Sequence, residues 1–247
     1  QLQQPGPIVA PQVGDITDLE VRLRDMDAMG IDMQAMSPWP GFLNRDIATA
    51  RAVNHGMADA VARYPERFTG LATVPMSRPA EAAKELERAV KDLGLRGVGI
   101  GSHVNGTNLD SRDFAPFYAK VQELDVPVFI HPVEVFGTDR LKSYYLSNLL
   151  GNPTETALAA ASLIFGGVLK EFPRLKFYLS HGGGSCPYLL GRWDHGWKVR
   201  AEGKGAIERE PSEYFKLLYF DALVHSPSVL GHLVQSVGAE RVMLAQC

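Results

Sequence analysis

Short apolar runs alternate with amphipathic segments along nearly the whole chain, and no other feature constrains the fold as strongly. The runs recur at intervals of roughly thirty residues, which is the spacing of βαβ units. They predict strands over residues 31–37, 68–74, 97–101, 126–130, 175–180, 217–223 and 241–245. Helical spacing between the runs predicts helices, two of them capped by Ser111 and Thr154, over residues 21–29, 44–64, 80–93, 111–124, 154–172, 187–197 and 227–237.

This alternation implies a parallel sheet, which is either doubly wound or closed into a (β/α)8 barrel. The predicted strands are short, polar groups follow their carboxyl ends, and no Gly-rich nucleotide loop follows the first of them. The glycine run at residues 182–184 does not match G-x-G-x-x-G. We therefore predict an α/β fold of the (β/α)8 TIM-barrel type. The seven predicted strands leave one unaccounted for, so we expect the first strand to be missing from this chain.

The two ends of the chain differ from its regular interior. Residues 1–20 open on a stretch rich in Pro and Gln and predict an irregular N-terminal segment. The chain closes on Cys247 within what the apolar pattern predicts to be a buried strand. A domain that stopped there would leave buried backbone groups unpaired. We therefore expect residues 1–247 to form a single barrel domain that is incomplete at both ends.

Composition and charge exclude several classes of partner. The net charge of −3 and the lack of a Lys/Arg run argue against a nucleic acid. No apolar stretch has transmembrane length, and the N-terminus lacks a signal-peptide layout, so no membrane partner is expected. The two cysteines cannot build a disulfide framework, which predicts a cytoplasmic protein.

Two of the apolar runs end in a histidine, and these residues are the strongest candidates for a site. His131 ends the run PVFIH, and His181 follows the run FYLS and precedes three glycines. The carboxyl ends of parallel strands lie at one mouth of a barrel, so we expect the two imidazoles to protrude there together. Neutral imidazole suits a divalent transition metal and also suits proton transfer near pH 7. The residues alone leave both roles open.

The metal argument is incomplete on residue patterns. A catalytic zinc needs three protein ligands, yet the chain contains no H-x-H, no H-E-x-x-H and no cysteine pair with ligand spacing. His103 lies in a loop after a predicted strand, where a supporting role is as plausible as ligation. Asp221 ends another predicted strand and is either a hydrogen-bond anchor or an active-site residue, with His225 close behind it. The long polar and aromatic connection at residues 135–148 is a candidate for an element that covers the site.

Arg192 lies on the predicted helix that leaves His181. Its guanidinium can bind a substrate carboxylate in bidentate fashion, or it can form a surface salt bridge with Asp194 or Glu202. His195, between two tryptophans, is a candidate for an interface patch. We expect Cys186 to be a packed thiol, because nothing in its sequence surroundings indicates a lowered pKa.

Several stretches together resemble the amidohydrolase-related family of the amidohydrolase superfamily, in the branch around the aminocarboxymuconate semialdehyde decarboxylases. The resemblance covers nearly the whole chain from about Val21. The segments that carry it most clearly are HGGGSCPYLLGRWDHG (181–196), FIHP (129–132), ETALAAASLIFGGVLKEFPRLK (155–176) and YFDALVHSP (219–227).

The resemblance implies a distorted barrel that holds one divalent metal ion, usually zinc, with manganese as a further candidate. The family's ligands are an H-x-H on the first strand, a histidine that ends the fifth and an aspartate that ends the eighth. His131 matches the fifth-strand ligand, and His181 matches the sixth-strand histidine that acts as acid and base. Arg192 matches an arginine that holds a substrate carboxylate in the neighbouring subunit's site, which implies a homodimer.

The chain departs from the family pattern at three places. No H-x-H strand is present, and Cys247 stands where the eighth-strand aspartate is expected. Asn148 lies near the position of an aromatic residue found in the decarboxylase. His131 is therefore the only metal ligand that the resemblance assigns within this chain.

These observations support three hypotheses. The first is a metal-dependent decarboxylase, a carbon–carbon lyase, that acts on a small unsaturated or aromatic carboxylic acid. In this hypothesis His181 moves the proton and Arg192 binds the carboxylate. The second is a metal-dependent hydrolase of a lactone or amide on the same site. The third is a metal-free barrel that serves as a binding or assembly subunit.

Overall fold

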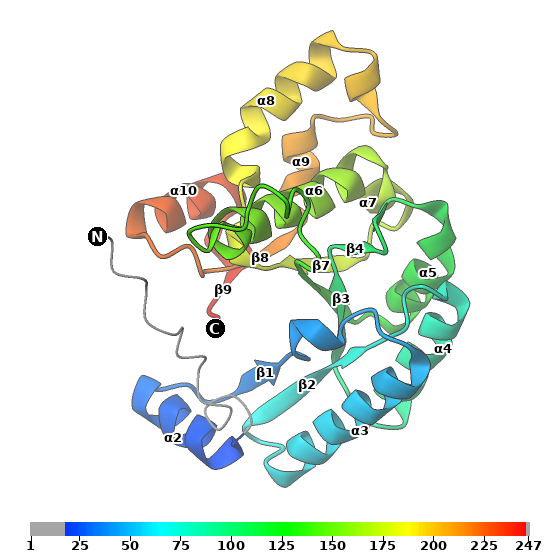
Figure 1. The fold of residues 1–247 in the computed structure, drawn as a ribbon, viewed down its shortest axis with the longest axis vertical. Helices are drawn as coiled ribbons and strands as arrows, with labels where there is room; N and C mark the ends of the chain where they lie inside the picture. The colour runs from blue at the N-terminus through cyan, green and yellow to red at the C-terminus, as the bar shows by residue number, and fades with distance from the viewer. Residues whose placement is uncertain (1–17, 246–247) are drawn as a thin grey trace.

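A computed structural model describes residues 18–245 and contains one main parallel sheet of seven strands (Figure 1). Its strand order, β1-β2-β3-β6-β7-β8-β9, follows the chain, as expected for successive βαβ units. All seven predicted strands are confirmed. They are β1 (Gln34–Met36), β2 (Phe68–Thr73), β3 (Gly97–Gly101), β6 (Pro127–His131), β7 (Lys176–Leu179), β8 (Tyr219–Asp221) and β9 (Val242–Met243). A separate hairpin consists of β4 (His103–Val104) and β5 (Thr107–Asn108).

Helices connect successive strands, and each predicted helix is present. They are α2 (Leu19–Met29), α3 (Ile47–Arg63), α4 (Pro79–Lys91), α5 (Ala115–Leu124), α6 (Asn152–Phe165), α7 (Val168–Glu171), α8 (Cys186–Val199), α9 (Pro211–Phe215) and α10 (Pro227–Val237). A π-helical turn, η3 (Ser147–Gly151), precedes α6. The curled parallel sheet with its crossover helices confirms the predicted α/β barrel class. Among the described residues β1 and β9 do not pair, so the sheet stays open.

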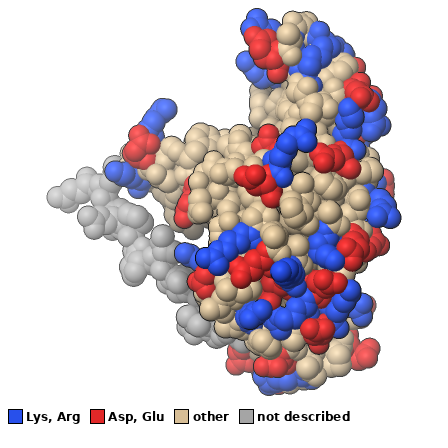
Figure 2. All heavy atoms as spheres, turned by 90° about the vertical axis from the view of Figure 1, so that its right-hand side faces the viewer, with Lys and Arg blue, Asp and Glu red and all other residues tan. Residues whose placement is uncertain are grey.

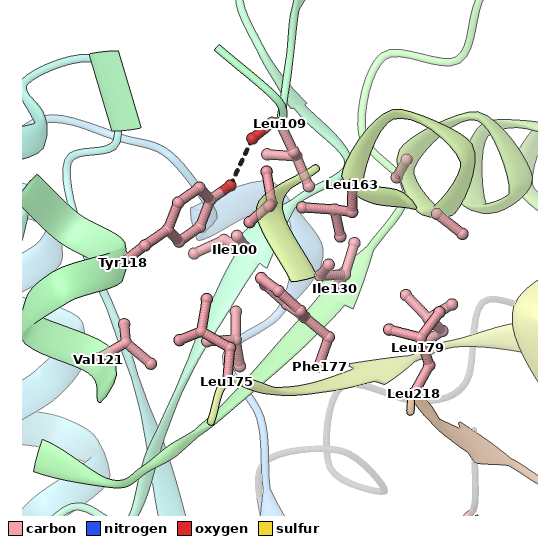
Figure 3. Close-up of a cluster of buried hydrophobic side chains, with 14 of the residues drawn as sticks. Ile100, Leu109, Tyr118, Val121, Ile130, Leu163, Leu175, Phe177, Leu179 and Leu218 are labelled. Carbon is pink, nitrogen blue, oxygen red and sulfur yellow. Dashed lines mark hydrogen bonds between the residues drawn. The ribbon is translucent and has the colours of Figure 1, made fainter. Parts of the chain in front are cut away.

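The core lies between one face of this sheet and the helices. Successive side chains of a strand point to opposite faces, so Val128 and Ile130 of β6 are fully buried on the helix side. Figure 3 shows Ile130 beside Phe177 of β7 and Leu163 of α6. Tyr118 of α5 completes this cluster, and its hydroxyl donates a hydrogen bond to a loop carbonyl. The alternate residues Phe129 and His131 lie half-buried on the other face of the sheet.

Two predicted boundaries in this fold are wrong. The helix predicted over residues 154–172 is divided, because Gly167 adopts a left-handed conformation with φ of 79° between α6 and α7. Thr154 does not cap that helix but lies inside α6, where its hydroxyl donates to the carbonyl of Leu150. The irregular segment predicted over residues 1–20 is also too long, because α2 begins at Leu19. The Asp18 carboxylate caps α2 at Leu19, and residues 1–17 lie outside the described part of the chain.

Charged side chains of both signs are interspersed over the face shown in Figure 2. Many form exposed ion pairs, such as Lys120 with Glu123 and Lys176 with Asp125. Each such pair contributes at most about 1 kcal/mol. Across residues 18–245, no helix has both the length and the apolar character needed to cross a membrane.

A buried polar network fixes the carboxyl end of β2 against two helices. The Asn54 side chain on α3 donates to the carbonyl of Thr73 at 3.0 Å and accepts from its N–H at 2.8 Å. Asn54 also donates to the Glu85 carboxylate on α4 at 2.8 Å. Arg88 and Arg51 hold the same carboxylate at 2.7 and 3.3 Å. Burial alone would raise the pKa of Glu85, but the hydrogen bonds from Arg88 and Asn54 outweigh it and hold that pKa below its ordinary value.

Replacing Glu85 with Gln should lower the free energy of unfolding at pH 7 by about 1–3 kcal/mol, because the amide loses the charge-assisted hydrogen bonds. A carboxylate whose pKa is lowered by folding stabilises the protein above its unfolded pKa of about 4.3, and this stabilisation is lost as pH falls through the folded value. Urea unfolding should therefore give a wild-type–variant difference that shrinks from pH 7 to about pH 3. A difference independent of pH would contradict this explanation. Glu66→Gln, at an exposed position, is the matched control.

Candidate active site

The two strand-end histidines meet at the carboxyl edge of the sheet. β6 and β7 are neighbours in parallel register, and the His131 and His181 ring centroids lie 5.2 Å apart in an edge-to-face arrangement. Phe129 lies two residues before His131 on the same face, with its ring 6.2 Å from the imidazole and 5.2 Å from the ring of Tyr178. The prediction that both imidazoles share one mouth is confirmed.

The ring of His131 is held in one tautomer. Its Nδ1 lies 2.9 Å from the carbonyl oxygen of Pro132. A carbonyl only accepts, so Nδ1 carries the hydrogen and Nε2 keeps its lone pair. Burial lowers the pKa of His131, an effect partly offset by this hydrogen bond and by the charge of Asp221. A neutral imidazole with an unprotonated Nε2 has the electronic form that a metal ligand requires.

The backbone at His181 is fixed by the carboxylate of Asp221. His181 has a left-handed φ of 58°, and the glycine that follows it has a φ of 59°. Asp221 accepts from the N–H of His181 at 2.8 Å, of Gly182 at 2.7 Å and of Leu223 at 3.1 Å. Burial raises the pKa of this carboxyl, while these donors lower it in part. Of the two roles that the sequence leaves open for Asp221, the structure favours the anchor, because both oxygens hold the turn.

The His181 imidazole faces two hydroxyl groups. Its Nδ1 lies 3.2 Å from Ser180 Oγ and 3.3 Å from Thr156 Oγ1 of α6. Burial is the main cause that lowers the pKa of His181, to about 4. The ring is therefore neutral near pH 7, with a lone pair on one of its two nitrogens. Sequence reasoning missed Thr156, although a polar residue within the largely apolar segment TALAAASLIF of α6 was a usable signal.

Gly184, the last glycine of the turn, is required by close backbone contact. It has a φ of 64°, and a Cβ there would lie 1.9 Å from the carbonyl oxygen of Pro153 in α6. Gly184→Ala should therefore lower the free energy of unfolding by about 2–4 kcal/mol, measured by urea denaturation. Gly191→Ala is the matched control, because nothing lies within 4 Å of a Cβ there. Gly191→Ala lies in the interior of α8 and should raise the free energy of unfolding by up to about 1 kcal/mol. Equal effects at the two sites would contradict the steric explanation.

Arg192 is exposed on α8, which projects away from the sheet in Figure 1. The salt bridge considered for it is absent. Asp194 accepts from the backbone N–H of Ser212, and Glu202 pairs with Arg200. Within residues 18–245, Arg192 has no hydrogen bond or ion pair. The structure therefore does not bring Arg192 into contact with either strand-end histidine of the same chain.

The remaining histidines have other surroundings. His103 is buried in β4, where Nδ1 accepts from the N–H of Gly106 at 3.0 Å and Nε2 donates to the carbonyl of Glu134 at 3.3 Å. It links two loops and has no nitrogen left for a ligand. His225 is exposed, with a left-handed φ of 53°. The other three, all exposed on helices, are His55, His195 and His232.

The single cysteine of the described region is a packed thiol, as predicted. Cys186 is fully buried, and its burial raises the pKa of the thiol. Cys247, at the expected position of an aspartate ligand, lies outside the described residues.

The connection after β6 exposes a group of large apolar side chains. Its members are Phe136, Tyr144, Tyr145, Leu149 and Leu150. Asn148 is exposed in the same segment. The connection follows the end of β6, and its role as an element that covers the site stays a prediction.

The described residues supply only part of a metal site. Within residues 18–245, no three His, Cys, Asp or Glu side chains come close enough together to hold a metal ion. His131 fits one ligand position by its tautomer and its place at the strand end. The role of His131 as a metal ligand is implied by the family resemblance and stays a prediction.

Known proteins with similar sequences and folds include several decarboxylases. The chain is 38% identical over 234 residues to the 2-amino-3-carboxymuconate-6-semialdehyde decarboxylase of Dictyostelium discoideum, covering 92% of this chain and 65% of that one. The chain therefore spans about two thirds of the length of this relative.

Two solved structures share the fold. The 5-carboxyvanillate decarboxylase of Sphingomonas paucimobilis is 33% identical and has a TM-score of 0.87, over 98% of this chain and 76% of that chain. The dihydroxybenzoic acid decarboxylase of Polaromonas sp. JS666 was solved with manganese and the inhibitor 2-nitroresorcinol. It is 30% identical with a TM-score of 0.83, over 94% of this chain and 75% of that chain. The amidohydrolase family pattern itself matches residues 13–245, so this chain belongs to the amidohydrolase family.

Proposed function

We propose that the intact protein is a metal-dependent decarboxylase, a carbon–carbon lyase, of a small unsaturated or aromatic carboxylic acid. The observation that carries this proposal is the pair of neutral, half-buried imidazoles 5.2 Å apart at the carboxyl edge of the sheet. The activities named for the relatives from Dictyostelium, Sphingomonas and Polaromonas support the same reaction class.

In this proposal His131 is a ligand of one divalent metal ion, and the other ligands come from outside residues 18–245. Zinc is the family's usual metal by resemblance, and the manganese bound in the Polaromonas relative supports manganese equally. Such an ion lowers the pKa of bound water and polarises the substrate.

His181 is the proposed acid and base. Decarboxylation breaks the bond to the carboxyl carbon, carbon dioxide leaves, and the electron pair stays on the substrate carbon, which must then gain a proton. A neutral His181 takes a proton from water at Nε2, which leaves hydroxide, and delivers that proton to the substrate carbon. Overall, the carboxylate and one water give the decarboxylated product, carbon dioxide and hydroxide. The negative charge of a bound carboxylate raises the pKa of an adjacent imidazole, so substrate binding promotes this uptake.

Arg192 is the proposed ligand of the substrate carboxylate, acting in the site of a second subunit. Its exposed guanidinium is unpaired within the described chain and lies on a helix that projects from the sheet. A guanidinium presents parallel N–H donors that match a carboxylate. The protein is then a homodimer with shared sites. The buried thiol of Cys186 is compatible with the cytoplasmic location that the cysteine content predicts.

Mixing two inactive variants tests whether the site is shared. Arg192→Ala and His181→Asn should each be nearly inactive, whereas unfolding and refolding them together should restore about one quarter of the wild-type activity. Half of the dimers are then mixed, and one of the two sites in each mixed dimer is intact. No recovery, with dimers shown by sedimentation, would place Arg192 outside the partner's site.

The reaction class is tested by product analysis with the metal-loaded protein. Aromatic and unsaturated carboxylic acids should release carbon dioxide and give the product that lacks the carboxyl group. Products of lactone or amide hydrolysis without carbon dioxide would favour the hydrolase hypothesis. Intact protein that binds neither zinc nor manganese would favour a binding or assembly role.

A further inference from the structure

Two adjacent polar residues of α6 are buried against the strand ends that carry the histidines. Glu155 is 2% exposed and Thr156 is fully buried. They lie in the first half of a helix whose other buried side chains are nearly all apolar. Burying polar groups is costly unless each has a defined partner, so the partners of this pair indicate what the pair does.

Glu155 holds α6 against the backbone around His131. One carboxylate oxygen accepts from the N–H of Phe136 at 3.1 Å, and the other accepts from the Ser102 hydroxyl at 3.4 Å. Ser102 in turn donates its N–H to the carbonyl of His131 at 3.0 Å, and its Oγ accepts from the N–H of Val133 at 3.3 Å. These contacts fix the position of α6 relative to the site, and hence the position of Thr156.

The Thr156 hydroxyl has one hydrogen, which already has an acceptor. It donates to the carbonyl of Asn152 at 3.0 Å, one helical turn earlier. Towards His181 Nδ1, at 3.3 Å, the oxygen therefore presents a lone pair. This arrangement is favourable only when Nδ1 carries the hydrogen. The second hydroxyl at Nδ1, that of Ser180, can donate or accept and imposes neither tautomer.

We infer that Thr156 is a positioning residue that holds His181 in its Nδ1–H tautomer, so that the Nε2 lone pair is available for chemistry. The inference rests on the proposed role of His181 as acid and base. His131 is held in the same tautomer by the Pro132 carbonyl, so both rings keep an unprotonated Nε2. In the wrong tautomer Nε2 carries a hydrogen, and the neutral ring cannot take up a proton there.

Nitrogen-15 NMR of the histidine rings tests the tautomer directly in the full chain, free of metal and substrate. The ring signals of His181 are assigned by their loss in His181→Asn. We expect the Nδ1–H form in the wild type and in Thr156→Ser, which keeps the hydroxyl. Thr156→Val keeps the shape but removes the lone pair that favours Nδ1–H. A neutral histidine ring by itself favours the Nε2–H form, and Ser180 can accommodate it by donating to Nδ1, so the Nε2–H fraction should rise. Ser180→Ala should leave the wild-type tautomer unchanged.

Several results would overturn the inference. They are an Nε2–H ring in the wild type, an unchanged ring in Thr156→Val, and a tautomer that switches in Ser180→Ala. These readouts do not depend on activity, so they remain decisive even if the protein is not a decarboxylase. Where decarboxylation is observed, Thr156→Val should lower kcat by about 10- to 100-fold with little change in KM, and Thr156→Ser should restore it. An unchanged kcat would contradict a role in positioning.

Discussion

Replacing His181 with Asn should lower kcat for decarboxylation by about 10²–10⁴-fold, the usual contribution of a positioned acid and base. The variant removes the imidazole that takes up and delivers the proton. Asparagine is chosen because it tolerates the left-handed φ of 58° better than alanine does. The rate of carbon dioxide release at saturating substrate measures the effect.

The control for this variant is His225→Asn. His225 has a similar left-handed φ of 53° and is exposed. The same His-to-Asn substitution there has a similar effect on the backbone but changes a residue with no proposed role in the reaction. It should retain nearly the wild-type kcat. Metal content and unfolding curves of His181→Asn should match those of the wild type, because the ring is not a proposed ligand. Unchanged turnover in a folded, metal-loaded His181→Asn would refute the role of His181.

Replacing His131 with Ala should abolish activity by removing a metal ligand. Loss of residues that merely support a ligand weakens metal binding by 10- to 100-fold, so loss of the ligand itself should weaken it by about 100-fold or more. Elemental analysis after dialysis should find metal in the wild type and little in the variant. Thermal unfolding gives a second measurement. Metal at about 100 times its Kd should stabilise the wild type by roughly 2.7 kcal/mol and the variant much less.

The control for metal binding is His195→Ala, at an exposed position on α8. It should bind metal and unfold like the wild type. If His131→Ala retained the full metal content and the metal-dependent stabilisation, His131 would not be a ligand, and the metal would have to be held elsewhere. Loss of activity with retained metal would instead indicate a role for His131 in substrate binding.

The strands and most helices were predictable from local patterns because burial of one face imposes a periodicity on the sequence. The histidines at the ends of two strands were predictable for the same reason, since parallel strands bring their carboxyl ends to one edge. Helix boundaries were less predictable. Whether the helix continued through Gly167 depended on the left-handed backbone that the folded chain adopts there. The cap of α2 by Asp18 was also missed, because its signal lies within a segment that is otherwise irregular.

The sequence by itself determined the fold class, the family and the two histidines, since each depends on residue types at fixed spacing along the chain. Only the tertiary structure decided what surrounds those histidines. Asp221 anchors the His181 turn across 40 positions of sequence, and Thr156 reaches the imidazole across 25. Such hydrogen bonds join residues that come together only when helices pack on the sheet, and no local pattern encodes their geometry. They decide the backbone conformation and the surroundings of the ring that the proposed chemistry requires.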